Sequence, residues 1–205
     1  MRRARRPGLR ALIAGAGVEP ERLDEGDVAF RLAPRLNAAG RLYRADAGVE
    51  LLSTDDDARA TEIAAELDKV NLERREVERE VYAAASAALG ELPANLREAS
   101  GLVLAGEGWH PGVVGIAASR IVERTGRPAI LLSIDENGRA KGSGRGVPGF
   151  DLLGALERCA GHLDRFGGHK AAAGVELAAS GIEAFGEVVA AAAAEQFPDG
   201  PPAEP

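Results

Sequence analysis

The 205-residue sequence is poor in several residue types that mark particular classes of protein. A single cysteine, Cys159, cannot form an internal disulfide, so nothing indicates an oxidising compartment. No apolar run approaches the roughly 18–20 residues that a membrane span needs. The basic start, MRRARRPGLRALIAGAG, has an apolar part too short and too interrupted by glycine for a signal peptide. We therefore expect a cytoplasmic protein with no membrane contact.

Lysine and arginine are absent from residues 171–205, which carry six acidic residues. Residues 46–98 are also acidic, with 14 acidic and 6 basic residues. Although the overall net charge is −7, the rest of the chain, residues 1–45 and 99–170, is basic, with 19 basic and 12 acidic residues. Because the local field matters more to a polyanion than the total charge, nucleic acid is not excluded as a partner.

The first half of the chain is predicted to be helical. Residues 1–54 read as short helices joined by turns, the first opened by Pro7 and closed by Gly15 and Gly17. Residues 55–90 have no Gly or Pro until the last position, which predicts one long amphipathic helix. Its narrow apolar stripe, interrupted by Arg74, fits a solvated helix leaning on a core or a coiled coil, and we interpret it as a rigid connector. The stripe comprises Ile63, Leu67, Val70, Val77, Val81, Ala84 and Ala88.

The second half alternates strand and helix patterns and predicts an α/β fold. Strands are expected at 101–106, at 127–135 and within 171–179, with a polar strand or loop at 139–146. Helices are expected at 113–126, 150–163 and 182–197, and residues 198–205 have the composition of a disordered tail.

GEGWHPGVVG (106–115) follows a strand and opens a helix, with Pro111 suited to the first helical turn. Backbone N–H groups at a helix start bind anions. Trp109 could stack on a base or sugar and His110 could donate to a phosphate, but a loop with a core-packed Trp and a solvated His fits equally.

RAKGSGRGVPG (139–149) places Lys141, Ser143 and Arg145 at alternate positions, which share one face of an extended segment. These three side chains all bind phosphate, and Gly142, Gly144 and Gly146 would lie on the other side. The alternative is a solvated edge strand, where Lys deters aggregation.

Two further segments combine glycine with basic or polar side chains. PRLNAAGRL (34–42) sets Arg35, Asn37 and Arg41 around an expected Ala-Ala-Gly turn, or caps a helix through Asn37. RFGGHKAAAG (165–174) sets His169 and Lys170 beside Gly167 and Gly168. The two glycines could let a ligand approach the main chain, or the segment could simply be a turn that contains His169.

The four segments occur in the order of a known family. FRLAPRLNAAGRL, GWHPGVVGIAASRIVERTGRPAILLS, KGSGRGVPGFDLLGALERC and RFGGHKAAAGVEL together resemble the C-terminal part of RecJ-type single-stranded-DNA-specific 5′-exonucleases of the DHH phosphoesterase superfamily. The resemblance covers most of residues 8–190. It implies a small mixed β-sheet flanked by helices, the DHH-associated domain, preceded by the connector helix and a short all-helical remnant.

The resemblance also implies domain limits and residue roles. Residues 1–54 would be the incomplete edge of the catalytic domain, 55–98 the connector, 99–197 the nucleic-acid-binding domain and 198–205 the tail. Arg41, supported by Asn37, would contact a phosphate near the active cleft, and His169 would face the scissile end. Ser143 and Arg145 would grip the 5′-terminal phosphate, and Trp109 and His110 match the strand-binding loop. Family members usually read GSGRS, so Gly146 removes one hydroxyl donor.

The family's Asp-His-His motif does not occur in this sequence, whose three histidines are His110, His162 and His169. The complete family enzyme uses Mn or Mg, and two-metal chemistry needs a carboxylate cluster that we do not find here. We therefore expect no cofactor in this chain, which would be a fragment or truncated product that binds single-stranded DNA without cutting it. A partner would be the missing catalytic domain. The alternatives are a fragment of a phosphodiesterase for short oligonucleotides or cyclic dinucleotides, a stand-alone single-strand-binding module, and a non-functional remnant.

Overall fold

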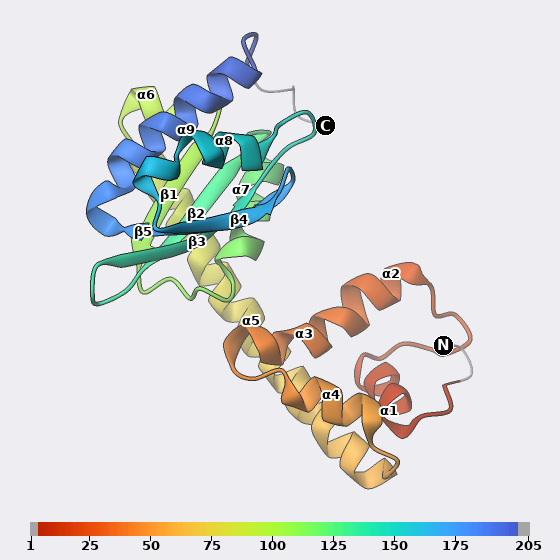
Figure 1. Ribbon diagram of the computed structural model, residues 1–205. Coiled ribbons are helices and arrows are strands. Elements are labelled where there is room, and N and C mark those ends of the chain that lie inside the picture. Colours follow the sequence, from red (N-terminus) through yellow and green to blue (C-terminus); the bar gives the residue numbers. More distant parts are fainter. Residues whose placement is uncertain (1–3, 201–205) are drawn as a thin grey trace. The chain divides into compact units, whose positions relative to one another are not determined.

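The computed structural model describes residues 4–200 and divides into two compact units, Met1–Glu76 and Val77–Pro205 (Figure 1). The boundary falls within α5 (Asp57–Glu91), a single helix of 35 residues. The long helix predicted from residues 55–90 is thus present. None of the helices in the described range is both long enough and apolar enough to cross a lipid bilayer.

The first unit packs short helices against the N-terminal half of α5. These are α1 (Pro7–Gly15), α2 (Glu25–Asp27), the π-helical turn η1 (Val28–Leu32), α3 (Ala33–Leu42) and α4 (Asp46–Ser53). As predicted, Pro7 stands in the first turn of α1. The core is aliphatic, as the scarcity of aromatic residues requires, and includes Leu12, Ile13, Leu32, Leu51, Ile63 and Leu67.

The buried stripe of α5 differs from the predicted one at its C-terminal end. Ile63, Leu67 and Val81 are buried as expected, but Ala84 is exposed, and Ala85 and Leu89 are buried instead. Arg74, expected to interrupt the stripe, lies within it, 7% exposed, beside Asn71, which is 1% exposed. The Asn71 Oδ1 accepts hydrogen bonds from the Nε and Nη2 of Arg74, so part of the buried guanidinium is satisfied within α5 itself.

The expected Ala-Ala-Gly turn at residues 38–40 is wrong, because these residues lie inside α3. Ala38 and Ala39 are buried, and alanine favours a helix more than any other residue. A Cβ at Gly40 would lie only 3.3 Å from the Cβ of Ala45, so the glycine serves close packing rather than a turn.

The second unit is a five-stranded mixed sheet in the order β1-β2-β3-β5-β4, flanked by helices. β1 (Leu102–Glu107) and β2 (Ala129–Ile134) are parallel and joined by α7 (Val114–Thr125); every other pair is antiparallel. The remaining strands are β3 (Arg139–Arg145), β4 (Arg165–His169) and β5 (Ala172–Ala178). The other elements are α6 (Ala94–Arg97), α8 (Leu152–Arg158), η2 (Ala160–His162), η3 (Ala179–Gly181) and α9 (Ile182–Gln196). The predicted α/β class with a small mixed sheet is confirmed.

Helices cover the two faces of the sheet unequally. α8 and α9 pack on one face around a core that includes Ile130, Leu132, Leu156, Phe185 and Val189 (Figure 1). α7 packs on the opposite face against β2 and β3. On that face β4 is exposed, and in β5 Gly174 is exposed while Ala172 and Glu176 are half-buried. One half of one sheet face is therefore open.

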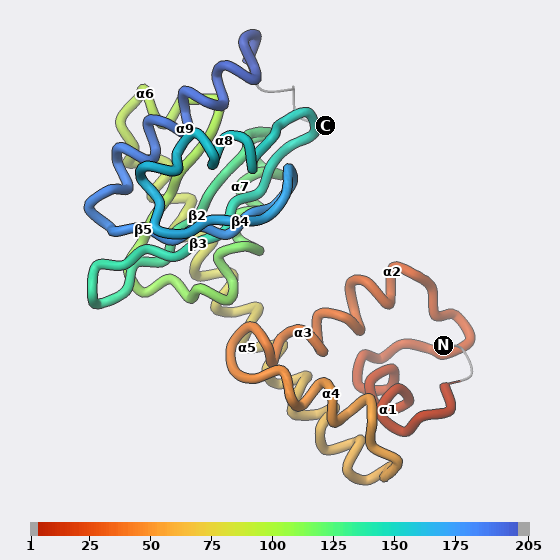
Figure 2. The backbone as a smooth tube through the Cα atoms, viewed as in Figure 1, coloured from red at the N-terminus to blue at the C-terminus, as the bar shows by residue number. Residues whose placement is uncertain are grey.

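Two local expectations need correction. Residues 165–169 form the edge strand β4 rather than a turn, anchored by Phe166 against the core, and Figure 2 traces β4 beside β5. Pro111 lies in a turn before α7, which begins only at Val114. Of the predicted tail at 198–205, the structure describes only residues 198–200, where the Gly200 N–H donates to the Phe197 carbonyl in a turn; the rest lies outside the described residues, and the disorder stays a prediction.

Candidate nucleic-acid interface

The polar side chains of β3 share one face of the sheet, as their alternate spacing predicts. Lys141 is exposed, and Ser143 and Arg145 are half-buried, whereas Gly142 and Gly144 face the core. A Cβ at Gly142 would come within 2.1 Å of the Leu131 carbonyl oxygen, so glycine is required there by the neighbouring strand. Gly146 lies beyond the end of β3, and its N–H donates to the Ala171 carbonyl.

The strand register places residues of β3, β5 and β4 in three successive rows on this face. Arg145 and His169 are both Cα partners of Ala172, and Ser143 and Gly167 are both partners of Gly174. The third row is Lys141, Glu176 and Arg165. Directly paired residues project from the same face of a sheet. We call the nine residues of these rows the open face: Lys141, Ser143, Arg145, Arg165, Gly167, His169, Ala172, Gly174 and Glu176.

The N-terminal turn of α7 adjoins one end of the open face. A Cβ at Gly115 would lie 2.9 Å from the Arg145 Nη2 and 3.3 Å from the Ser143 Oγ. The absence of a side chain at Gly115 thus lets the Arg145 guanidinium and the Ser143 hydroxyl pack directly against the start of a 12-residue helix. Because a helix start carries partial positive charge, the guanidinium and the hydroxyl beside it suit a phosphate group.

The two residues predicted to bind nucleic acid from the loop before α7, Trp109 and His110, differ in their exposure. Trp109 is only 8% exposed, and its ring packs so closely on Gly106 that a Cβ there would lie 2.3 Å from the Cε2. The predicted stacking of a base on Trp109 is therefore wrong, because the ring is buried. His110 is half-buried, and its Nδ1 accepts a hydrogen bond of 3.1 Å from the Gly112 N–H in the turn before α7.

The glycines and basic residues around β4 have different environments. Gly167 has open space where a Cβ would stand, whereas a Cβ at Gly168 (φ 152°) would meet the Ala172 carbonyl oxygen at 2.4 Å. The Nδ1 of exposed His169 accepts a hydrogen bond of 3.3 Å from the Ala171 N–H, so in the neutral ring Nε2 carries the proton and can donate. The Lys170 Nζ lies 3.3 Å from the Asp151 carboxylate.

The predicted residues of the first unit lie on α3. Asn37 and Arg41 are exposed and four residues apart, so they share one side of the helix. Arg35 is instead directed inward, with its Nε 2.8 Å from the Asp68 carboxylate of α5 and its side chain only 14% exposed. This ion pair was missed because residue spacing within α3 does not show which side chain the packed helix will meet.

Comparisons with known proteins show the family to which the chain belongs. Residues 98–195 match the model of the DHHA1 domain. The chain is 44% identical over 160 residues to the single-stranded-DNA-specific exonuclease RecJ of Bacillus subtilis, a match that covers 78% of this chain and 20% of that protein. The corresponding figures for RecJ of Escherichia coli are 42% over 154 residues, covering 75% and 27%. Residues 98–195 are a DHHA1 domain of the RecJ type. The chain spans only about a fifth to a quarter of these relatives.

Solved RecJ structures agree with this assignment. Thermus thermophilus RecJ in complex with Mn²⁺ has a TM-score of 0.82 and 36% identity, covering 94% of this chain and 28% of that chain. An exonuclease RecJ bound to manganese has a TM-score of 0.75 and 38% identity, covering 92% of this chain and 45% of that chain. Within the range that the structure describes here, no group of three or more His, Cys, Asp or Glu residues is suited to hold a metal ion.

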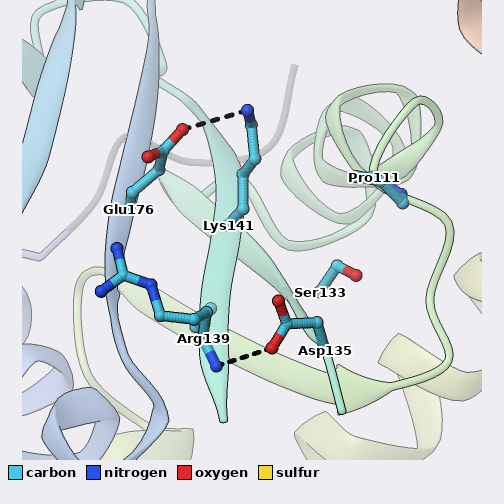
Figure 3. Close-up of a pocket in the computed structure, with 7 residues that line it drawn as sticks. Pro111, Ser133, Asp135, Arg139, Lys141 and Glu176 are labelled. Atoms are coloured by element: carbon cyan, nitrogen blue, oxygen red, sulfur yellow. Dashed lines mark hydrogen bonds and ion pairs between the residues drawn. The ribbon is translucent and has the colours of Figure 1, made fainter. Parts of the chain in front are cut away.

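Two shallow hollows of the DHHA1 domain meet at Lys141 and Glu176. One, of about 300 Å³, is lined by Pro111, Ser133, Asp135, Arg139, Ala140, Lys141 and Glu176 (Figure 3). The other, of about 250 Å³, lies over Gly167 and Gly174 and is also bordered by Arg165. The Lys141 Nζ is 3.0 Å from the Glu176 Oε1, an ion pair that sequence spacing did not reveal.

Proposed function

We propose that this chain is the nucleic-acid-binding part of a RecJ-like single-stranded-DNA 5′-exonuclease, and that the open face holds the sugar–phosphate backbone of the strand. The observation that carries the proposal is the row shared by Arg145, Ala172 and His169, with the start of α7 beside Arg145. A guanidinium beside the positive end of the α7 dipole and an imidazole then share one open surface. The names of the similar RecJ proteins, which specify single-stranded DNA, support the choice of ligand.

In this proposal each residue acts on the phosphate backbone. Ser143 and Arg145 bind the 5′-terminal phosphate at the start of α7, and His169 donates from Nε2 to a phosphate oxygen near the scissile end. Arg41 and Asn37 act from α3 in the first unit, and His110 lines the approach before α7. Gly167 and Gly174 provide a floor without side chains, along which a strand can lie close to the sheet.

The usual second serine of the family's GSGRS segment is Gly146 here. A Cβ at this position would lie 3.0 Å from the Lys170 carbonyl oxygen, which is tight contact. We therefore propose that Arg145, Ser143 and the start of α7 bind the phosphate without a hydroxyl at position 146. Lys170 adds charge at the hairpin end, although Asp151 partly offsets it.

We further propose that the 205-residue chain alone binds a strand and does not cleave it, with 99–197 as the binding domain and 55–98 as the connector. The sequence contains no Asp-His-His motif, and the described residues offer no cluster that fits a metal ion. RecJ structures have been solved with Mn²⁺ or Mg²⁺, and in this proposal the metal-dependent step is carried out by residues outside those described here.

Fluorescence anisotropy with the purified chain tests this function. A 3′-labelled, 5′-phosphorylated oligothymidylate should bind at low salt, more tightly than the matching duplex, and affinity should fall steeply as salt rises. Gel analysis of the same strand with Mn²⁺ should show no product. Binding to neither strand nor duplex would overturn the proposal, and metal-dependent product would overturn the binding-only part. Displacement of the labelled strand by a cyclic dinucleotide at a much lower concentration than by the unlabelled strand would instead indicate a dinucleotide phosphodiesterase.

A further inference from the structure

Glu176 is a carboxylate set directly between two basic side chains on the open face. Its Cα partners are Lys141 in β3 and Arg165 in β4, and its Oε1 lies 3.0 Å from the Lys141 Nζ. The hydrogen bond and charge of Lys141, followed by the charges of Arg165 and Arg139, lower the pKa of Glu176. The carboxylate is therefore ionised at neutral pH and sits where a bound phosphate would find two cations.

The position of Glu176 along the face matters for a strand bound there. Each row is two residues from the next, or about 7 Å, so the Lys141–Glu176–Arg165 row lies about 13–14 Å from the Arg145–His169 row. The intervening row has glycine in β5 and β4, with open space where a Cβ at Gly167 would stand. A strand anchored at Arg145 and running along the strands therefore reaches Glu176 about two nucleotides further on.

We propose that Glu176 is a built-in competitor for the nucleic-acid backbone, which holds Lys141, in the same row as Arg165, until a phosphate of a sufficiently long bound strand displaces it. This inference rests on the proposed function of the open face. Glu176 would thereby make binding depend on the length of the nucleic-acid strand, since a mononucleotide or dinucleotide anchored at Arg145 would not extend to Glu176.

The Lys141–Glu176 ion pair is weak enough for a phosphate to replace the carboxylate reversibly. The Lys141 and Glu176 side chains are 69% and 30% exposed, and ion pairs between partly exposed side chains contribute little to stability because water screens them. A phosphate tethered to an anchored strand has a high effective concentration at the row, whereas a free mononucleotide does not. The tethered phosphate can therefore take the place of the carboxylate.

The test compares the 205-residue chain with its Glu176→Gln variant on 5′-phosphorylated thymidylates of increasing length. Glu187→Gln is the matched control, because Glu187 is exposed on α9, the helix that packs on the opposite sheet face, and the charge change is identical. Glu176→Gln should bind trinucleotides and longer strands roughly three- to tenfold more tightly at low salt. Its affinity for the mononucleotide and dinucleotide, and the affinities of Glu187→Gln, should remain near those of the unmodified chain. Combining Glu176→Gln with Lys141→Ala should reduce the gain.

Four results would overturn the inference. Weaker binding of long strands by Glu176→Gln would show that the carboxylate orients Lys141 for the ligand rather than competing with it. An equal gain at every length, or an equal gain in Glu187→Gln, would show only a general charge effect. If the unmodified chain binds strands but Glu176→Gln matches it at all lengths, this inference fails while the proposed function stands. If neither binds any strand, both fail. Thermal melting of each variant confirms that it is folded.

Discussion

Arg145 of β3 and His169 of β4 lie in one row of the sheet, each paired directly with Ala172 of β5. Neighbouring strands are spaced by about 4.8 Å, so the two Cα atoms are about 10 Å apart on the same face. Twenty-three residues separate them in sequence, and antiparallel pairing of β5 with both neighbours brings them together. The predictions below follow from this face and from the packing that supports it.

Replacing Arg145 with alanine should weaken binding to all single strands alike, because the guanidinium contacts phosphate rather than bases. The slope of log affinity against log salt should become shallower by about one unit. Anisotropy titrations of several oligonucleotide sequences over a salt series measure both effects. Arg158→Ala removes the same charge from α8, on the other side of the sheet, and should leave affinity unchanged. A loss confined to one base sequence would contradict a phosphate contact.

Gly167→Thr should stabilise the domain while weakening strand binding. No atom lies within 4 Å of where a Cβ at Gly167 would stand, and a β-branched residue suits a strand better than glycine. We expect the free energy of unfolding to rise by about 0.5–1 kcal/mol. The same side chain would stand on the floor of the open face and obstruct a bound strand. Urea unfolding and anisotropy separate the two effects, and unchanged affinity would show that the strand does not pass over Gly167.

Gly106→Ala should destabilise the DHHA1 domain by about 1–3 kcal/mol, the usual cost of overpacking. The new methyl group would stand 2.3 Å from Cε2 of the Trp109 ring, which is buried. Equilibrium urea unfolding followed by tryptophan fluorescence measures the change directly at the affected ring. Gly167→Ala is the control, because it adds the same atom in open space. Equal stability of the two variants would mean that Trp109 is not packed on Gly106.

Asp151 should give the domain a pH-dependent stability. Its carboxylate accepts a hydrogen bond of 3.0 Å from the Gly154 N–H at the start of α8, which, with the nearby Lys170, lowers the pKa below its ordinary value of 3.8. A lowered pKa in the folded state means stabilisation that is present above pH 3.8 and is lost as the pH falls through the folded-state value. Unfolding measurements of the chain and its Asp151→Asn variant should therefore differ most near neutral pH and converge in acid. A constant difference across that range would contradict this ionisation.

The sequence by itself determined the features that depend on local spacing. A 3–4 periodicity without internal Gly or Pro specified α5, and apolar segments specified β1, β2, β5, α7, α8 and α9 of the second unit. The same alternation correctly placed Lys141, Ser143 and Arg145 on one face of β3. These features follow from the geometry of the backbone alone, since side chains repeat every 3.6 residues in a helix and every two in a strand.

Tertiary structure decided which of those side chains meet and which become buried. Only pairing with β5 converts RFGGH from an apparent turn into an edge strand and aligns His169 with Arg145. Only packing removes Trp109 from the surface and joins Arg35 to Asp68. The physical reason is that burial and ion pairing depend on neighbours far away in the chain, and no local repeat in the sequence specifies them.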